Sequence, residues 1–205
     1  CEQFDDHYWL EKDRHGGFPT ELHQALAKDG WLGICIPEQY GGSGLGITEA
    51  SIMMQTISES GAGMSGASAV HMNIFGLNPV VQFGTEEQKR RMLPPLISGA
   101  ERACFAVTEP NTGLNTTQLK VKAERVGDHY VLSGTKVWIS TAQVAEKMLI
   151  LARTTPLEEV TKHSDGLSLF YTKFDRDFIR VHEIEKMGRK ACLLYTSDAA
   201  DDMQC

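Results

Sequence analysis

The spacing of apolar residues changes just after residue 100, and this change constrains the fold more than any other feature. Upstream, Leu22, Ala25 and Leu26 repeat at the helical spacing of three and four residues. Downstream, apolar and polar residues alternate in short runs, as in strands with one buried face. Because the two periods belong to different elements, we expect an α+β protein. An N-terminal all-helical domain over residues 1–100 should precede an antiparallel β-barrel domain over residues 101–191.

Start and stop signals place helices in the first part. Thr85 and Gln88 form a capping-box pattern, and Gly99 is a suitable stop for the helix between them. Thr48 is the expected cap of an earlier helix, and residues 67–77 are expected to form the next one.

Seven segments of the second part have the alternation typical of strands. Gly127 and Asp128 form a good two-residue hairpin turn between two of them, and the polar segment 154–165 predicts a surface loop. Short strands at regular spacing are typical of a small antiparallel barrel or sandwich, and we expect the barrel. The predicted strands are 104–108, 120–126, 129–132, 136–139, 147–152, 166–171 and 178–183.

Composition excludes several classes of function. The formal net charge of −7 with no basic stripe argues against a nucleic-acid partner, and no apolar run is long enough for a membrane span. Five scattered cysteines without a CxxC pair indicate reduced thiols in an intracellular compartment. Seven histidines without a ligand spacing predict no metal site.

The last residues differ from the rest of the chain. The run from Cys192 to Asp201 reads CLLYTSDAAD, which resembles the translation of a transposase adapter used in DNA sequencing libraries. A ten-residue coincidence is a weaker explanation than a library scar, although a native acidic tail is the alternative. We therefore expect residues 192–205 to be a non-native tail.

Two patterns are better explained by structure than by chemistry. The glycine-rich run 41–46 matches neither GxGxxG nor a P-loop, and no βαβ unit surrounds it, so we expect a structural loop. His71, beside an apolar stripe, is expected to be a hydrogen-bonded structural histidine rather than a proton carrier.

Two blocks, residues 104–113 and 136–140, each read as a short apolar strand ending in hydroxyl or turn residues. Strand ends of this kind can present a flat wall, backbone amides and a hydroxyl to a planar cofactor with polar edges. Taken alone, the first block is a turn, Trp138 is a core aromatic and Ser140 is a strand-end hydroxyl. Their order and spacing together make them specific.

These blocks resemble the paired flavin-binding motifs of acyl-CoA dehydrogenases, and the resemblance extends over residues 2–191. It is carried also by Gly30-Trp31-Leu32-Gly33, Pro37-Glu38-Gln39-Tyr40-Gly41-Gly42, Phe83-Gly84-Thr85-Glu86-Glu87-Gln88-Lys89, Gly134-Thr135-Lys136-Val137-Trp138-Ile139-Ser140 and Glu185-Lys186-Met187-Gly188. It implies an N-terminal helical domain, a middle β-barrel that binds FAD, and a C-terminal four-helix domain. The third would lie beyond this chain.

The resemblance also implies roles for residues. Thr108 matches the hydroxyl at the flavin edge, Trp138 the aromatic beside the ring, and Ile139 and Ser140 the contacts to its reactive centre. Many family members carry Ser-Asp where this chain has Leu114 and Asn115, which weakens a polar role there. The expected FAD-binding residues are Phe105, Ala106, Val107, Thr108, Gly113, Leu114, Trp138, Ile139 and Ser140, and the expected acyl-pocket residues are Leu114, Met72 and Phe75.

By resemblance, the parent enzyme oxidises acyl-CoA to trans-2-enoyl-CoA and passes electrons to an electron-transferring flavoprotein, as a homotetramer. The catalytic base is expected in the C-terminal domain, with Glu109 serving the turn, so the fragment itself should be inactive. The alternatives are an acyl-CoA oxidase or flavin monooxygenase of the same fold, or a non-catalytic scaffold. The compartment, whether bacterial cytoplasm, mitochondrion or peroxisome, stays open.

Overall fold

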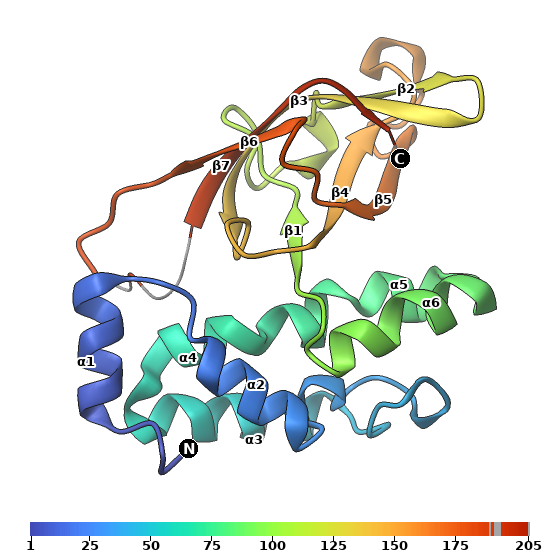
Figure 1. Cartoon of the computed structure of the whole chain (residues 1–205). Helices are drawn as coiled ribbons and strands as arrows, with labels where there is room; N and C mark the ends of the chain where they lie inside the picture. Colours follow the sequence, from blue (N-terminus) through green and yellow to red (C-terminus); the bar gives the residue numbers. More distant parts are fainter. Residues whose placement is uncertain (189, 191–193, 205) are drawn as a thin grey trace. The chain divides into compact units, whose positions relative to one another are not determined.

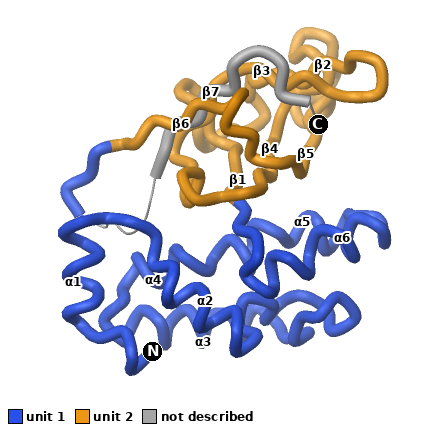
Figure 2. The backbone as a smooth tube through the Cα atoms, viewed as in Figure 1, with its two compact units in different colours: residues 1–103, 185–193 blue, residues 104–184, 194–205 orange. Residues whose placement is uncertain are grey.

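The computed structural model describes residues 1–188, 190 and 194–204. The chain divides into two compact units (Figure 2). Unit 1 comprises Cys1–Ala103 with Glu185–Leu193, and unit 2 comprises Cys104–Ile184 with Leu194–Cys205. Each unit is described by itself.

Unit 1 consists of helices (Figure 1). Its described residues form six α-helices: α1 (Asp6–His15), α2 (Thr20–Lys28), α3 (Ile47–Ile57), α4 (Gly63–His71), α5 (Asn78–Phe83) and α6 (Glu86–Ile97). Between them lie the 3₁₀ turns η1 (Trp31–Gly33) and η2 (Glu38–Tyr40) and the wider π-type turns η3 (Ser58–Ala62) and η4 (Met72–Gly76).

Local capping explains most of these helix boundaries. The capping box of α6 is confirmed: the Thr85 hydroxyl accepts from the Gln88 amide at 3.2 Å, and the Thr85 amide donates to the Gln88 side chain at 2.8 Å. The expected cap Thr48 is wrong, since Gly46 is the N-cap of α3 and its amide donates to Glu49. The predicted helix 67–77 is in fact α4 followed by η4.

The glycine-rich run is a structural loop. The amides of Ser43, Gly44 and Leu45 donate to carbonyls of residues 33, 36 and 34, so they are not free to bind a phosphate. A side chain at Gly42 would meet the Ile36 carbonyl oxygen at 1.9 Å, so only glycine permits this approach.

Unit 2 is built on a seven-stranded sheet. Its strands are β1 (Ala103–Ala106), β2 (Lys122–Val126), β3 (His129–Ser140), β4 (Lys147–Arg153), β5 (Leu167–Lys173), β6 (Ile179–Glu183) and β7 (Leu194–Gln204). The strand order is β1-β4-β2-β3-β7-β6, with β5 paired to β4. The predicted turn at Gly127 and Asp128 is confirmed, because Val126 pairs with His129 across it.

The expected purely antiparallel arrangement is wrong, because the sheet is mixed. Strand β2 pairs antiparallel with β3 but parallel with β4, through Lys122 and Arg153. After β3 the chain reverses and enters β4, so β4 runs antiparallel to β3. Strand β4 pairs with the edge of β2 that faces away from β3. Because β2 and β3 are antiparallel, β4 runs parallel to β2.

The two strands predicted at 129–132 and 136–139 form one strand, β3. Its register against β7 shifts between Leu132 and Gly134 and again between Lys136 and Ile139. Such shifts mark bulges, which bend a strand without ending it. At Gly134 the backbone has φ of 132° and lies against Val121, so this glycine lies in a bulge within one strand, where the sequence predicted a gap between two strands.

The expected non-native tail coincides largely with β7. Its backbone pairs antiparallel with both β3 and β6. Residues 191–193 and 205 lie outside the described residues. Backbone pairing requires no particular side chain, so the adapter interpretation stays a prediction.

Candidate functional site

The two motif blocks meet where β1 ends. The Val137 amide donates to the Thr108 carbonyl at 2.9 Å. Strands β1 and β3 are not neighbours in the sheet, since β4 and β2 lie between them in its order. This bond therefore joins segments that the strand ladder alone would leave apart. It brings Thr108 close to the residues that precede Trp138.

A buried ion pair lies behind this junction. Lys136 Nζ is 2.9 Å from Glu109 Oε1 and donates to the Val107 carbonyl at 2.8 Å. Both side chains are almost fully buried, Lys136 at 2% and Glu109 at 6% exposure. Burial lowers the pKa of Lys136, while the hydrogen bond and charge of Glu109 oppose that shift.

The side chain and backbone of Glu109 both form hydrogen bonds that hold the turn in place. Its carboxylate accepts from the backbone amides of Lys120 at 2.7 Å and Val121 at 2.9 Å, in addition to Lys136. Its backbone exchanges two hydrogen bonds with Thr112. Three donors therefore occupy the carboxylate oxygens and tie them to neighbouring backbone and to Lys136. This geometry suits a structural role and not that of a general base.

Trp138 is presented outward by the second bulge of β3. Its backbone has φ of 61°, a left-handed conformation that costs a bulky residue on the order of 1–3 kcal/mol. The indole is 58% exposed, whereas the next residue, Ile139, is buried. The structure thus maintains a flat aromatic surface at some conformational cost, which is a common property of ligand sites.

The remaining first-block residues provide open backbone and free hydroxyls. Among the described residues, the side-chain hydroxyls of Thr108 and Ser140 form no hydrogen bond, and both residues are half-buried. A side chain added at Gly113 would meet nothing within 4 Å, and Leu114 is fully exposed. The buried Ala106 can offer only its backbone. Phe105 and Val107 are half-buried.

These observations fit a planar cofactor with polar edges. The wall has an aromatic face at Trp138, uncommitted hydroxyls at Thr108 and Ser140, and an unobstructed backbone at Gly113. FAD has both a flat ring and phosphates, so the residue types match what it requires.

The expected acyl-pocket residues Met72 and Phe75 belong to unit 1. Met72 is buried in η4, and Phe75 is half exposed, with its ring 5.0 Å from that of His71. His71 Nδ1 lies 2.5 Å from the Ser68 carbonyl. Burial lowers the pKa of His71, so it is a neutral, hydrogen-bonded histidine at neutral pH.

Two residues of structural importance were not singled out from the sequence. Lys136 was placed in the second motif block without a role of its own, and Arg153 was not considered. A lysine at an inward position of an apolar strand is a signal of a buried partner, and Glu109 in the other block was an available one. Within the described part of the chain, no cluster of three metal-ligating side chains occurs and no helix is long and apolar enough to cross a membrane.

Two family models match the chain. The acyl-CoA dehydrogenase N-terminal domain matches residues 2–100, and the acyl-CoA dehydrogenase middle domain matches residues 104–198. Mitochondrial isovaleryl-CoA dehydrogenase from Solanum tuberosum is 34% identical over 181 residues, which are 87% of this chain and 43% of that protein.

Solved structures agree with these matches. The prolyl acyl carrier protein oxidase AnaB superposes with a TM-score of 0.87 at 27% identity, covering 98% of this chain and 53% of that one. A glutaryl-CoA dehydrogenase from Mycobacterium smegmatis in complex with FADH2 gives a TM-score of 0.81 at 25% identity, covering 98% and 50%. The chain therefore spans about half the length of the proteins it resembles.

Proposed function

Because the chain belongs to the acyl-CoA dehydrogenase family, we propose that it is part of an FAD-dependent enzyme that oxidises an acyl-CoA to its trans-2-enoyl form. The observation that carries this proposal is the wall where the two motif blocks meet. There, an exposed indole held at positive φ stands on a strand whose Val137 amide bonds to Thr108. A purely structural strand end has no need of this arrangement.

Specific residues would hold FAD at this wall. Trp138 would pack against the flavin ring, with Ile139 supporting it from the buried side of β3. Thr108 and Ser140 would donate hydrogen bonds to the polar ring edge, and the open backbone at Gly113 would approach the phosphates. Bound FAD supplies a hydride acceptor, which no amino-acid side chain provides. The indole of Trp138 would shield one face of the ring from water.

The substrate would contribute an acidic α-proton, whose removal needs a carboxylate base. Glu109 is bound to Lys136 and two amides, so we assign the base to a part of the parent enzyme outside this chain. Leu114, Met72 and Phe75 are the candidates for acyl contacts. An electron-transferring flavoprotein is the proposed acceptor, and a homotetramer the proposed assembly. On this assignment, the chain alone lacks turnover and retains FAD weakly.

This proposed function can be tested by assays of the full-length gene product. With a panel of acyl-CoA thioesters, we expect flavin bleaching and reduction of an electron-transferring flavoprotein. Trp138→Ala should weaken FAD retention, whereas the matched substitution Trp31→Ala in unit 1 should not. Absence of FAD from the purified full-length protein would refute the proposal and favour a non-catalytic scaffold.

A second function has one observation in its favour. The AnaB structure that superposes on this chain is described as a prolyl acyl carrier protein oxidase. A flavin monooxygenase of the same fold is the related alternative. These enzymes differ from dehydrogenases in how reduced flavin meets oxygen. Stoichiometric peroxide release by the full-length protein, without need of an electron-transferring flavoprotein, would favour the oxidase.

A further inference from the structure

A pocket separate from the flavin wall lies within unit 2, where β2 and β4 diverge. The two strands pair only through Lys122 and Arg153, and beyond this point the edge of β2 has no strand partner on that side among the described residues. The wedge between β2 and the segment 154–158 forms a pocket of about 610 Å³. This volume is within the range of small-molecule sites in proteins.

The floor of the pocket is apolar and partly aromatic. Leu119 and Ala123 lie beneath the pocket and are almost fully buried, whereas the half-buried Leu157 presents accessible apolar surface to it. The Tyr130 ring forms a further wall and is braced edge-to-face by Phe170 at a centroid distance of 5.0 Å. An apolar or aromatic body of a ligand would therefore replace water favourably here.

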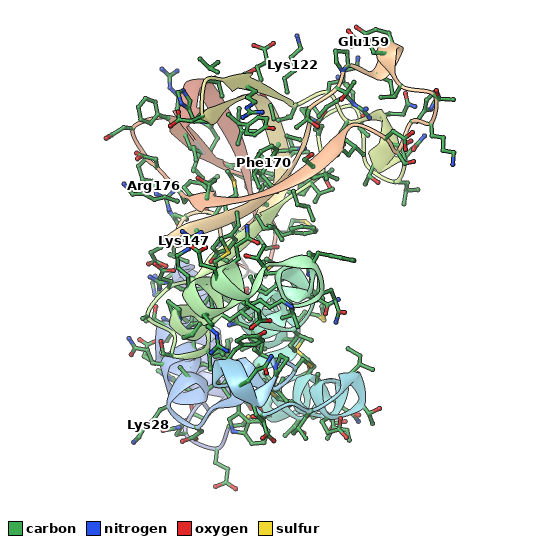
Figure 3. The ribbon with its side chains drawn as sticks, turned by 90° about the vertical axis from the view of Figure 1, so that its right-hand side faces the viewer. Lys28, Lys122, Lys147, Glu159, Phe170 and Arg176 are labelled. Atoms are coloured by element: carbon green, nitrogen blue, oxygen red, sulfur yellow. The ribbon has the colours of Figure 1, made fainter. Side chains whose placement is uncertain are left out.

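The rim carries an excess of positive charge. Lys120, Lys122, Arg125 and Arg153 line the pocket, against Glu124 and Glu158, for a net charge of +2 in a chain of formal charge −7. In the described residues, none of the first three forms an ion pair with a carboxylate. Lys122 projects from β2 at the upper edge of Figure 3.

Arg153 adds a positive charge whose position is fixed by backbone carbonyls. Its guanidinium donates to the carbonyls of Leu119, Thr117 and His163 at 2.8 to 3.1 Å, and to that of Asp165 at 3.0 Å. Carbonyls satisfy its hydrogen bonds without cancelling its charge. The charge of Arg153 therefore adds to the positive potential of the pocket that it lines.

We propose that this pocket binds a small organic anion, with an aromatic or alkyl body against Tyr130 and Leu157 and its charge at Lys122 and Arg125. The free edge of β2 offers backbone amides to the same ligand. The proposal is independent of the flavin wall and of the reaction assigned to the parent enzyme.

The test uses the 205-residue chain and the fluorescent aromatic sulfonate 8-anilinonaphthalene-1-sulfonate. In titrations at low salt, Lys122→Gln/Arg125→Gln should bind the dye about fivefold more weakly than the unaltered chain. The matched control Lys28→Gln/Arg91→Gln removes the same two charges from unit 1 and should leave the affinity unchanged. The difference between the two variants should shrink as salt rises above 0.5 M.

A second measurement locates the dye. In amide NMR spectra of the labelled chain, we expect shifts concentrated at residues 119–125 and 153–158. The cationic dye thioflavin T should cause no such shifts. Equal losses in both double variants, or dye-induced shifts confined to unit 1, would overturn the proposal. Shifts at the pocket with unaltered affinity in Lys122→Gln/Arg125→Gln would equally refute the role of the rim charges.

Discussion

Removing the buried ammonium of Lys136 should destabilise unit 2 more than removing any exposed lysine. In Lys136→Met the side chain keeps its length, but the Val107 carbonyl loses its donor and the Glu109 carboxylate loses its counter-charge. The Glu109 carboxylate remains buried and Val107 half-buried, so water cannot fully replace what is lost.

The magnitude follows from what Glu109 retains. Breaking a buried ion pair by deleting one partner costs about 3–5 kcal/mol. Here two backbone amides still donate to the carboxylate, so we expect a loss near the lower limit, about 3 kcal/mol. Glu109→Gln should also destabilise, because it leaves the ammonium unpaired. The double variant should lose less than the sum of the single losses.

The assay must distinguish the two units, since their unfolding need not be concerted. Hydrogen exchange of the peptide that contains Lys120 and Val121 reports directly on the amides bound to Glu109. We expect faster exchange there in Lys136→Met, together with a lower urea midpoint for unit 2. The matched control is Lys173→Met, which removes an exposed lysine paired with Asp175 at 3.2 Å and should change neither.

The dependence of stability on alkaline pH provides a second test of the role of Lys136. Burial places the pKa of Lys136 in the folded protein below its ordinary 10.5, so just below pH 10.5 the unfolded chain binds more protons. The Lys136 contribution to stability therefore rises with pH in that window, and the gap between the unaltered chain and Lys136→Met should widen. Equal destabilisation by Lys136→Met and Lys173→Met, at any pH, would refute the reasoning.

Three further predictions concern other parts of the chain. Arg153→Lys should lower the stability of unit 2 by about 2 kcal/mol, because three ammonium donors cannot replace the guanidinium fork; a urea midpoint equal to that of the unaltered chain would contradict this. Burial raises the pKa of the Cys104 thiol to about 12, so at pH 8 iodoacetamide should label the exposed Cys1 and, more slowly, the half-buried Cys35, but not Cys104 in the native chain; peptide mapping measures this. Sequencing the source gene across codons 189–205 should show that the tail is an adapter scar, and a genuine stop codon after the tail would instead make it native.

The features that the sequence predicts well depend on neighbouring residues. The capping box of α6 and the turn at Gly127 and Asp128 each lie within four residues, and both are confirmed. The division into helical and strand-rich parts follows from hydrophobic period, which is also local.

The features that it predicts poorly depend on contacts between distant residues. The mixed sheet arises because β4 pairs with β2 and not with β3, and alternation carries no information on which edge a strand joins. The Glu109–Lys136 pair spans 27 positions, and although an inward lysine signals a buried partner, alternation alone does not identify that partner as Glu109. Arg153 likewise donates to the Asp165 carbonyl in the loop that follows β4. This bond depends on the path of the loop back toward Arg153, which the local sequence pattern does not predict.

At Trp138, a single bulge reverses which side chains of β3 face the interior and which face outward. Strict alternation from the buried Lys136 would bury Trp138 and expose Ile139, and an isolated tryptophan in an apolar strand is most often a core residue. The register shift between Lys136 and Ile139 inserts an extra residue, so the phase inverts and the indole faces outward. Lys136 precedes this shift and shares the inward face with Leu132, and its ammonium holds Val107 and Glu109 behind the wall. The buried ion pair therefore follows from the alternation of β3 before the bulge and the exposed ring from the bulge itself, which is why the two lie within three residues of each other.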